Sequence, residues 1–327
     1  MYIGYCQEDD NKTRCGKFEI MTNSKKYYIW IDNVKGLAII LVVLWHCGYL
    51  CGKEYLQWFQ HAVPLFLFCS AYLFRNKVNG NYWSKHQFVK LLKRIVLPYI
   101  LVELLVVSIL FGKSLFSNYT LPTTFYDFIR MGGYGPGAYF PLVYVQCWLM
   151  IPFLVILKER TSFYKGFFLF IIVCVLMEST FYLTCANRSW LWRLLAIKYL
   201  MILYVGVNYE EFVKRRLLSC ILIMLSIALA VLDIYFYPFD NMGWNGFHFF
   251  TSFYILLLIS FLMKLNSITL SYVGKHSYEM FLVQLGYFAV AYQSFSLNGI
   301  MDFGIIVFLS MIVIYFKKRL TYKFNIC

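Results

Sequence analysis

Long apolar runs recur along the chain after its first 27 residues, and they restrict the fold more than any other feature. A membrane-spanning helix needs about 20 mainly apolar residues to cross about 30 Å of hydrocarbon. On this criterion we predict spans at 29–50, 61–75, 88–111, 140–157, 163–184, 194–209, 217–237, 247–264, 277–293 and 299–316. The sequence therefore predicts an all-α integral membrane protein with about ten transmembrane helices.

Composition supports this class. Hydrophobic residues make up 61% of the 327 and charged residues only 14%, whereas soluble domains carry about 45–50% and 25%. These values exclude a disordered protein, a disulfide-stapled secreted domain and most water-soluble enzymes. We divide the chain into a polar cytoplasmic N-terminal segment (1–27), a transmembrane domain (28–317) and a short cytoplasmic tail (318–327).

The charge distribution predicts which ends of the helices face the cytoplasm. The net charge is +14, from 30 Lys and Arg against 16 Asp and Glu. With ten spans and the N-terminus inside, 23 of the 30 basic residues fall on the inner side and five on the outer side. Cytoplasmic loops carry such an excess of Lys and Arg. We therefore expect an N-in, C-in multi-pass protein of the cytoplasmic (inner) membrane, with the lipid bilayer rather than a nucleic acid as its partner.

Cysteines give no sign of a metal centre. The ten cysteines are scattered with no CxxC pair, and most lie inside apolar runs, where a thiol behaves as a small hydrophobic side chain. Metal-ligand spacing is therefore absent, and we expect no bound metal.

The first predicted helix carries an unusual stripe of ionisable side chains. Lys35 and His46 are eleven residues apart, which places them on one helix face about 16 Å apart along the axis. Asp32 lies one turn before Lys35 on that face and can pair with it. Ionisable groups inside a membrane are costly and mark functional sites. A neutral imidazole in the outer half of the membrane is suited to act as a general base.

Several segments, in the same order and helices, resemble the acyltransferase-3 family of integral-membrane acyltransferases. The family signature is a basic residue, ten intervening residues and a histidine, which Lys35 and His46 fit. The other similar segments are 64–74, 90–99, 135–140 with Gln146, 193–200 with Gly206, and 274–278 with Gln284. Three positions depart from the family pattern: Lys35 stands for the commoner Arg, Ala71 for Gly, and Gln284 for a His that many members carry.

The resemblance implies transfer of an acyl group, commonly acetyl, from cytoplasmic acyl-CoA to an acceptor across the membrane. On this interpretation His46 is the general base on an acceptor hydroxyl, with Asp32 and Lys35 as its catalytic partners, although a covalent acyl-His intermediate is also open. Basic residues at the third helix entry would bind the phosphates of CoA. These are Lys90, Lys93 and Arg94. The substrate and oxyanion candidates are Tyr139, Gln146, Arg193, Lys198 and Gln284.

Two functions remain open from the sequence. The first is O-acetylation of a surface polysaccharide or its glycolipid precursor, with acetyl-CoA as co-substrate. The second is a transporter or exporter of an anionic glycan or lipid precursor, which would use the intramembrane charges as its pathway. The sequence is compatible with a homo-oligomer. We also expect Glu103 and Glu178, two carboxyls within apolar runs, to pair with basic neighbours.

Overall fold

The structure is a computed structural model of the chain. It describes residues 28–50, 62–75, 85–116, 128, 132–185, 189–236, 252–265, 267–291 and 299–324. Within these ranges every regular element is a helix, so the predicted all-α class is confirmed. The boundaries of the N-terminal segment and the tail remain predictions.

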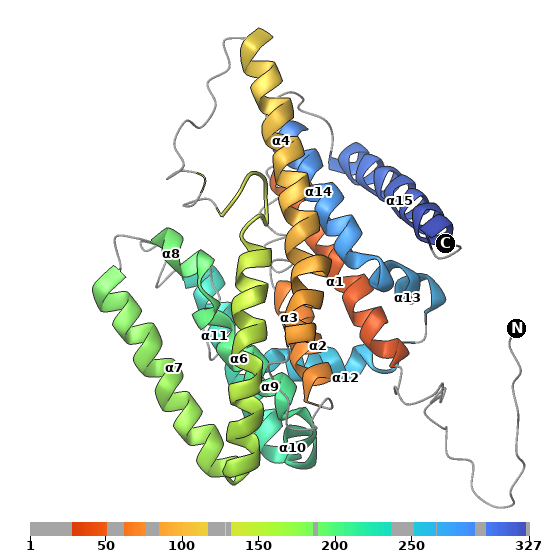
Figure 1. The fold of residues 1–327 in the computed structure, drawn as a ribbon. Coiled ribbons are helices and arrows are strands. Elements are labelled where there is room, and N and C mark those ends of the chain that lie inside the picture. The colour runs from red at the N-terminus through yellow and green to blue at the C-terminus, as the bar shows by residue number, and fades with distance from the viewer. Residues whose placement is uncertain are drawn as a thin grey trace, which may run out of the picture.

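Figure 1 shows how the helices follow one another along the chain. The first half contains α1 (Ile29–Leu50), α2 (Ala62–Phe74), α3 (Lys85–Leu91), the π-helix η2 (Leu92–Val96), α4 (Leu97–Phe116), α6 (Phe140–Arg160) and α7 (Phe163–Cys185). The second half contains α8 (Ser189–Leu194), the 3₁₀ helix η4 (Ala196–Tyr199), α9 (Leu200–Val207), α10 (Tyr209–Lys214), α11 (Arg216–Phe236), α12 (Tyr254–Leu262), α13 (Ile268–Lys275), α14 (Ser277–Ala291) and α15 (Gly299–Phe324).

Five helical stretches within the described residues are long and apolar enough to cross a membrane. They are Ile29–Gly48, Lys85–Gly112, Phe140–Arg160, Phe163–Phe181 and Gly299–Arg319. Three shorter apolar helices, Ala62–Phe74, Ala196–Val207 and Arg216–Leu229, correspond to further predicted spans. These helices make the chain a multi-pass membrane protein, while the count of ten and the N-in, C-in orientation stay predictions.

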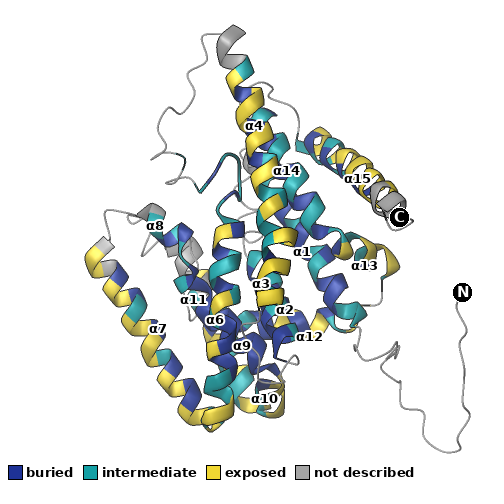
Figure 2. Ribbon diagram, viewed as in Figure 1, coloured by how far each residue is buried: buried dark blue, intermediate teal, exposed yellow. Residues whose placement is uncertain are grey.

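The outer helices expose their apolar side chains, as helices in lipid do. Phe168 and Leu176 of α7 are 61% and 59% exposed, and Ile300 of α15 is 78% exposed. Figure 2 shows exposed faces along α4, α7 and α15, while α9 lies within the bundle. Every residue of α9 is buried. A helix that is apolar on all sides belongs at the centre of a bundle.

The closest helix contact joins α1 to α13. A Cβ added to Gly36 would overlap the carbonyl oxygen of Leu270, and one added to Gly274 would overlap the carbonyl oxygen of Asp32. Small residues let two membrane helices bring their backbones together and gain van der Waals contact. The Nδ2 of Asn33 also donates to the carbonyl oxygen of Leu265, at 2.5 Å, just before α13. These contacts fix the position of α1.

The predicted span at 194–209 begins two residues late, at Ala196, because the chain breaks just before it. Leu195 is extended (φ −99°, ψ 144°) and separates α8 from η4. The side chain of Gln146 on α6 bridges the break: its Nε2 donates to the carbonyl oxygen of Leu194 at 2.8 Å, and its Oε1 accepts from the N–H of Ala196 at 3.1 Å. Hydropathy alone gave no sign of the break because the residues on both sides are apolar.

We expect Gly274→Ala to destabilise the protein, because its new methyl group must push α1 and α13 apart. Overpacking of this kind costs about 1–3 kcal/mol. Thermal unfolding in detergent would show a lower midpoint for Gly274→Ala. Gly304→Ala on α15 is the control, since a Cβ there meets no atom within 4 Å. Equal midpoints for the two variants would contradict the close contact.

We also expect Gln146→Ala to destabilise the broken helix. It leaves a buried carbonyl and a buried N–H without partners, at about 1–3 kcal/mol for each unsatisfied group. Thermal unfolding and proteolysis within residues 189–200 would measure the effect. Ser108→Ala is the control, because the Ser108 hydroxyl is exposed and donates only to the carbonyl of Leu104 in its own helix. If the Gln146→Ala protein is as stable as Ser108→Ala, the two hydrogen bonds of Gln146 do not stabilise the break.

Candidate functional site

His46 lies near the end of α1 and faces α14 and the segment that leads into α6. Its ring packs edge-on against Phe288 of α14, with 6.0 Å between ring centroids. A Cβ built on Gly137 would lie 3.9 Å from the Nε2 of His46 and 3.9 Å from the Nε2 of Gln284. The structure therefore brings together His46, Gln284 and the glycine-containing segment, which lie far apart in the sequence.

We call residues 132–138 the glycine loop. Four of its glycines have positive φ: Gly132, Gly133, Gly135 and Gly137. Such backbone conformations favour glycine because a Cβ would be strained there. At Gly137 the absence of a side chain also leaves room, since a Cβ would lie 3.2 Å from the ring of Phe281. The loop thus forms one wall of the space at His46.

Gln284 contributes a polar group to this space. Its side chain is fully buried on α14, and neither its Nε2 nor its Oε1 has a hydrogen-bond partner among the residues that the structure describes. Buried polar atoms without partners are costly. An amide in this state beside His46 offers a donor and an acceptor to a ligand or water.

Asp32 and Lys35 occupy the other end of α1. Asp32 is buried and Lys35 is half-buried, and both lie beside Cys69 of α2. The structure thus directs this part of α1 towards α2, while His46 faces α14. The catalytic partnership of Asp32 and Lys35 with His46 stays a prediction.

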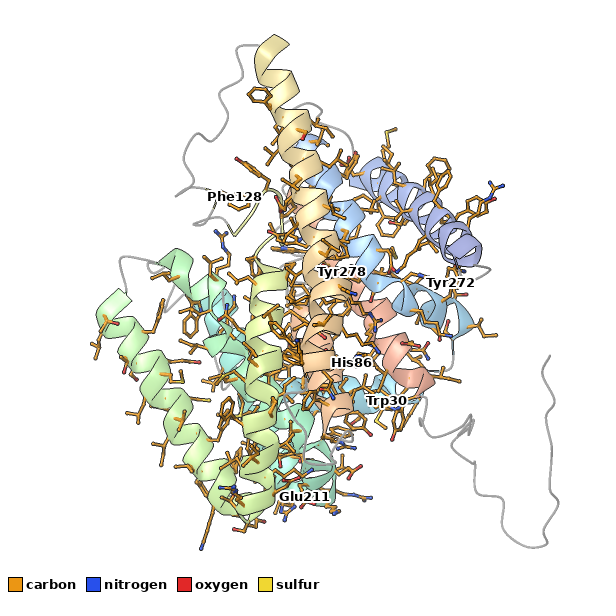
Figure 3. The ribbon with its side chains drawn as sticks, in the orientation of Figure 1. Trp30, His86, Phe128, Glu211, Tyr272 and Tyr278 are labelled. Carbon is orange, nitrogen blue, oxygen red and sulfur yellow. The ribbon has the colours of Figure 1, made fainter. Side chains whose placement is uncertain are left out.

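Lys90, Lys93 and Arg94 are exposed at the start of the long helical stretch formed by α3, η2 and α4. Lys93 and Arg94 lie in η2, and π-helical turns occur frequently at functional sites. The hydroxyl of Tyr278 on α14 donates to the carbonyl oxygen of Ile95 at 2.5 Å, so α14 packs directly against this turn (Figure 3).

Polar side chains continue from Arg94 into the bundle. Arg94 lies near Tyr144 of α6, whose hydroxyl is 3.2 Å from the Oγ of Ser70 on α2. Ser70 is the neighbour of Cys69, which lies beside Asp32 and Lys35. Among these groups, the hydrogen bond between Ser70 and Tyr144 joins α2 to α6.

A second group of candidate residues gathers around Tyr139. Lys198 is buried, with its Nζ 5.7 Å from the ring centroid of Tyr139 and 5.0 Å from that of Tyr199. The guanidinium carbon of Arg193 is 6.0 Å from the Tyr139 centroid. Aromatic faces attract cations in this way. Gln146, in contrast, uses both ends of its amide to hold Leu194 and Ala196.

The sequence did not predict the partners of Glu103. Its Oε2 accepts a hydrogen bond from the backbone N–H of Tyr134 in the glycine loop, at 3.0 Å, and Tyr99 one turn earlier donates to the carbonyl oxygen of Gly132 at 2.9 Å. Among the described residues, Glu103 bonds to this loop and not to the basic neighbour that the sequence predicted. A carboxyl in an apolar run signals some partner, but not which one.

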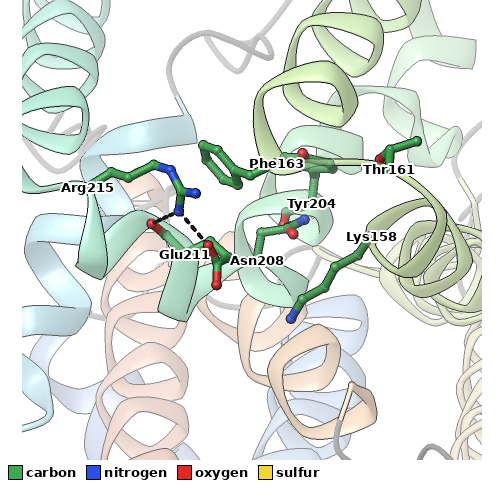
Figure 4. A pocket seen from close by; sticks show the side chains of 7 residues that line it. All are labelled: Lys158, Thr161, Phe163, Tyr204, Asn208, Glu211 and Arg215. Carbon is green, nitrogen blue, oxygen red and sulfur yellow. Dashed lines mark hydrogen bonds and ion pairs between the residues drawn. The ribbon is translucent and has the colours of Figure 1, made fainter.

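A pocket of about 220 Å³ lies at the opposite end of the bundle, where α6 and α9 approach α10 (Figure 4). It is lined by Lys158, Thr161, Phe163, Tyr204, Asn208, Glu211 and Arg215. The Nζ of Lys158 donates to the carbonyl oxygen of Val207 at 3.0 Å. Hydrogen bonding by the Arg215 guanidinium lowers the pKa of Glu211, so this carboxylate is paired in place. None of the predicted site residues lines this pocket.

Comparison with known proteins identifies the family. Searches of curated proteins and of solved structures find no match. A family model described as an acyltransferase domain matches residues 28–319, nearly the whole chain. This stretch includes α1 with Lys35 and His46, the glycine loop and α14 with Gln284. The chain belongs to the acyltransferase-3 family of membrane acyltransferases.

Proposed function

We propose that this membrane acyltransferase transfers an acyl group from cytoplasmic acyl-CoA to a hydroxyl of an extracytoplasmic glycan or glycolipid. The observation that carries the proposal is the meeting of His46 Nε2 and Gln284 Nε2 beside Gly137. A titratable ring and an unpaired buried amide around one space are the parts that acyl transfer needs: a base and an oxyanion donor.

His46 acts on the acceptor hydroxyl. Its neutral ring takes the hydroxyl proton while the acceptor oxygen attacks the thioester carbonyl carbon, and the C–O bond forms. When the tetrahedral intermediate collapses, the C–S bond breaks, and the protonated ring returns its proton to the leaving thiolate. Direct transfer of this kind needs no covalent acyl-His intermediate, although a covalent route would use the same ring.

Gln284 supplies the donor for the developing oxyanion. Its Nε2 has no partner in the described part of the chain, so it can turn to a new charge without breaking a bond seen there. Lys198, Tyr139 and Arg193 form a cationic and aromatic group that suits an acceptor sugar approaching from outside. Gln146 is assigned the structural task of holding the broken helix, because its amide oxygen and nitrogen are already bonded.

The donor enters from the cytoplasmic side. The phosphates of CoA cannot enter lipid, and the exposed Lys90, Lys93 and Arg94 present positive charge at one helix entry. The pantetheine arm then follows the polar side chains of Tyr144 and Ser70 towards α1, where Asp32 and Lys35 line its path. An acetyl group fits best, because Phe281 and Phe288 crowd the space at His46.

The proposal carries consequences for location and partners. The active orientation is N-in and C-in within the cytoplasmic (inner) membrane, with acetyl-CoA as co-substrate and no metal. The partners are the bilayer and the acceptor, with no nucleic acid, and a homo-oligomer is compatible with the chemistry. Flux of an anionic glycan without any acyl donor would instead support the exporter hypothesis.

We expect His46→Ala and His46→Gln to lower acyl transfer by about 10²–10⁴-fold, the usual contribution of a general base. The assay uses protein in lipid vesicles, labelled acetyl-CoA and a glycan fraction from the cells that make the protein. His86→Ala is the matched control, because His86 is an exposed histidine on α3. Transfer at the full rate by His46→Ala would overturn the mechanism.

We expect the triple variant Lys90→Gln, Lys93→Gln, Arg94→Gln to raise the KM for acetyl-CoA, because charge-assisted hydrogen bonds to its phosphates are lost. The KM should rise at least about tenfold at low salt and by less at high salt, where exposed charges are screened. Lys165→Gln is the control, since Lys165 is exposed at the start of α7. An unchanged KM would contradict the proposal that these three residues bind the phosphates of CoA.

A further inference from the structure

Glu103 is a buried carboxyl that the proposed mechanism does not use. It lies within the membrane-spanning stretch Lys85–Gly112 and is only 5% exposed. Placing such a group in a membrane helix costs about 2.5–3.5 kcal/mol on insertion scales. Its partner is the backbone N–H of Tyr134, and no described basic side chain bonds to it. The carboxyl is therefore directed at the glycine loop.

The glycine loop packs closely against α4 around Glu103. The hydroxyl of Tyr99 donates to the carbonyl oxygen of Gly132, and a Cβ built on Gly133 would overlap both this hydroxyl and the Oε1 of Glu103. Two side chains one helical turn apart thus hold two consecutive parts of the loop. The Tyr99 hydroxyl also interacts with this carboxyl, whose second oxygen, Oε1, is buried.

The far end of the same loop forms the wall at His46. A Cβ on Gly135 would lie 2.7 Å from the carbonyl oxygen of Leu285 and 3.1 Å from the Cβ of Ala289, so this residue packs on α14. Two residues later, Gly137 lies between Phe281, Gln284 and His46. A short segment therefore connects Glu103 on α4 to the candidate site.

We infer that Glu103 is a positioning residue that holds the glycine loop, and so Gly137, at the correct distance from His46 and Gln284. Without the carboxylate the Tyr134 N–H loses the acceptor on α4 that holds it, in an interior where backbone groups must be satisfied within the protein. The loop then shifts, and the space for the reacting groups changes. The expected effect on catalysis rests on the proposed function. The effect on the position of the loop rests on the contacts alone.

The test compares Glu103→Ala and Glu103→Gln with matched changes at Glu178, a second buried carboxyl, in α7. Misplacing a site by about 1 Å can cost about 10²-fold in rate. We expect Glu103→Ala to lower kcat by at least about tenfold, with the KM for acetyl-CoA within about twofold of wild type. Glu103→Gln should keep most of the activity, because its amide oxygen can accept the same hydrogen bond.

Hydrogen–deuterium exchange gives a readout that does not depend on activity. In Glu103→Ala, the peptide covering residues 132–139 should exchange faster, and in Glu103→Gln and Glu178→Ala it should exchange as in wild type. Unchanged exchange in Glu103→Ala overturns the inference even if the protein proves to have another function. Glu103→Gln as inactive as Glu103→Ala also overturns it, since the carboxylate would then act in the chemistry itself.

Tyr99→Phe covers the case in which Glu103→Ala does not fold. This change removes only the hydroxyl that holds Gly132, and we expect kcat to fall by about threefold to tenfold with faster exchange of the same peptide. A Tyr99→Phe protein with wild-type kcat and wild-type exchange would overturn the inference that α4 holds the glycine loop in place. A fully active His46→Ala with an altered loop in Glu103→Ala would instead overturn the proposed mechanism and leave the loop contact standing.

Discussion

Backbone groups outside regular helices must find partners within the protein when they lie among membrane helices, and the candidate site depends on how this chain supplies them. Two such irregular segments are the glycine loop and the break at Leu195. Glu103 and Gln146 each use a side chain on a neighbouring helix to satisfy such groups. The entry into α6, and with it the wall beside His46, is placed by these few hydrogen bonds.

The first helix organises the rest because it contacts different partners along its length. Near its start, Gly36 lets α13 approach so closely that only a residue without a side chain fits. Asp32 and Lys35 lie beside α2, and His46 near the other end meets α14 and the glycine loop. A helix fixed on several sides presents its histidine in one orientation, which suits the proton transfer that we propose for it.

Much of this could be predicted from the sequence, because apolar length and helical period depend on local residues. The bounds of α1, α6 and α7 agree with prediction to within a few residues, and the ordered family segments pointed to His46, Gln284 and the loop at 135–140. The rest depends on contacts between distant segments. No local pattern shows that Glu103 bonds to the backbone of Tyr134, or that Gln146 replaces the missing helical bonds at Leu195.

The arrangement around His46 also has a consequence for biogenesis. His46 belongs to α1, whereas Gln284 and Phe288 lie on α14, more than 200 residues later in the sequence. Proteins are made from the N-terminus onward, and their early segments begin to fold first. The histidine is therefore made and inserted well before its amide neighbour, and the site cannot form until α14 has been inserted. Incomplete chains are thus unable to assemble the site, however stable their early helices are.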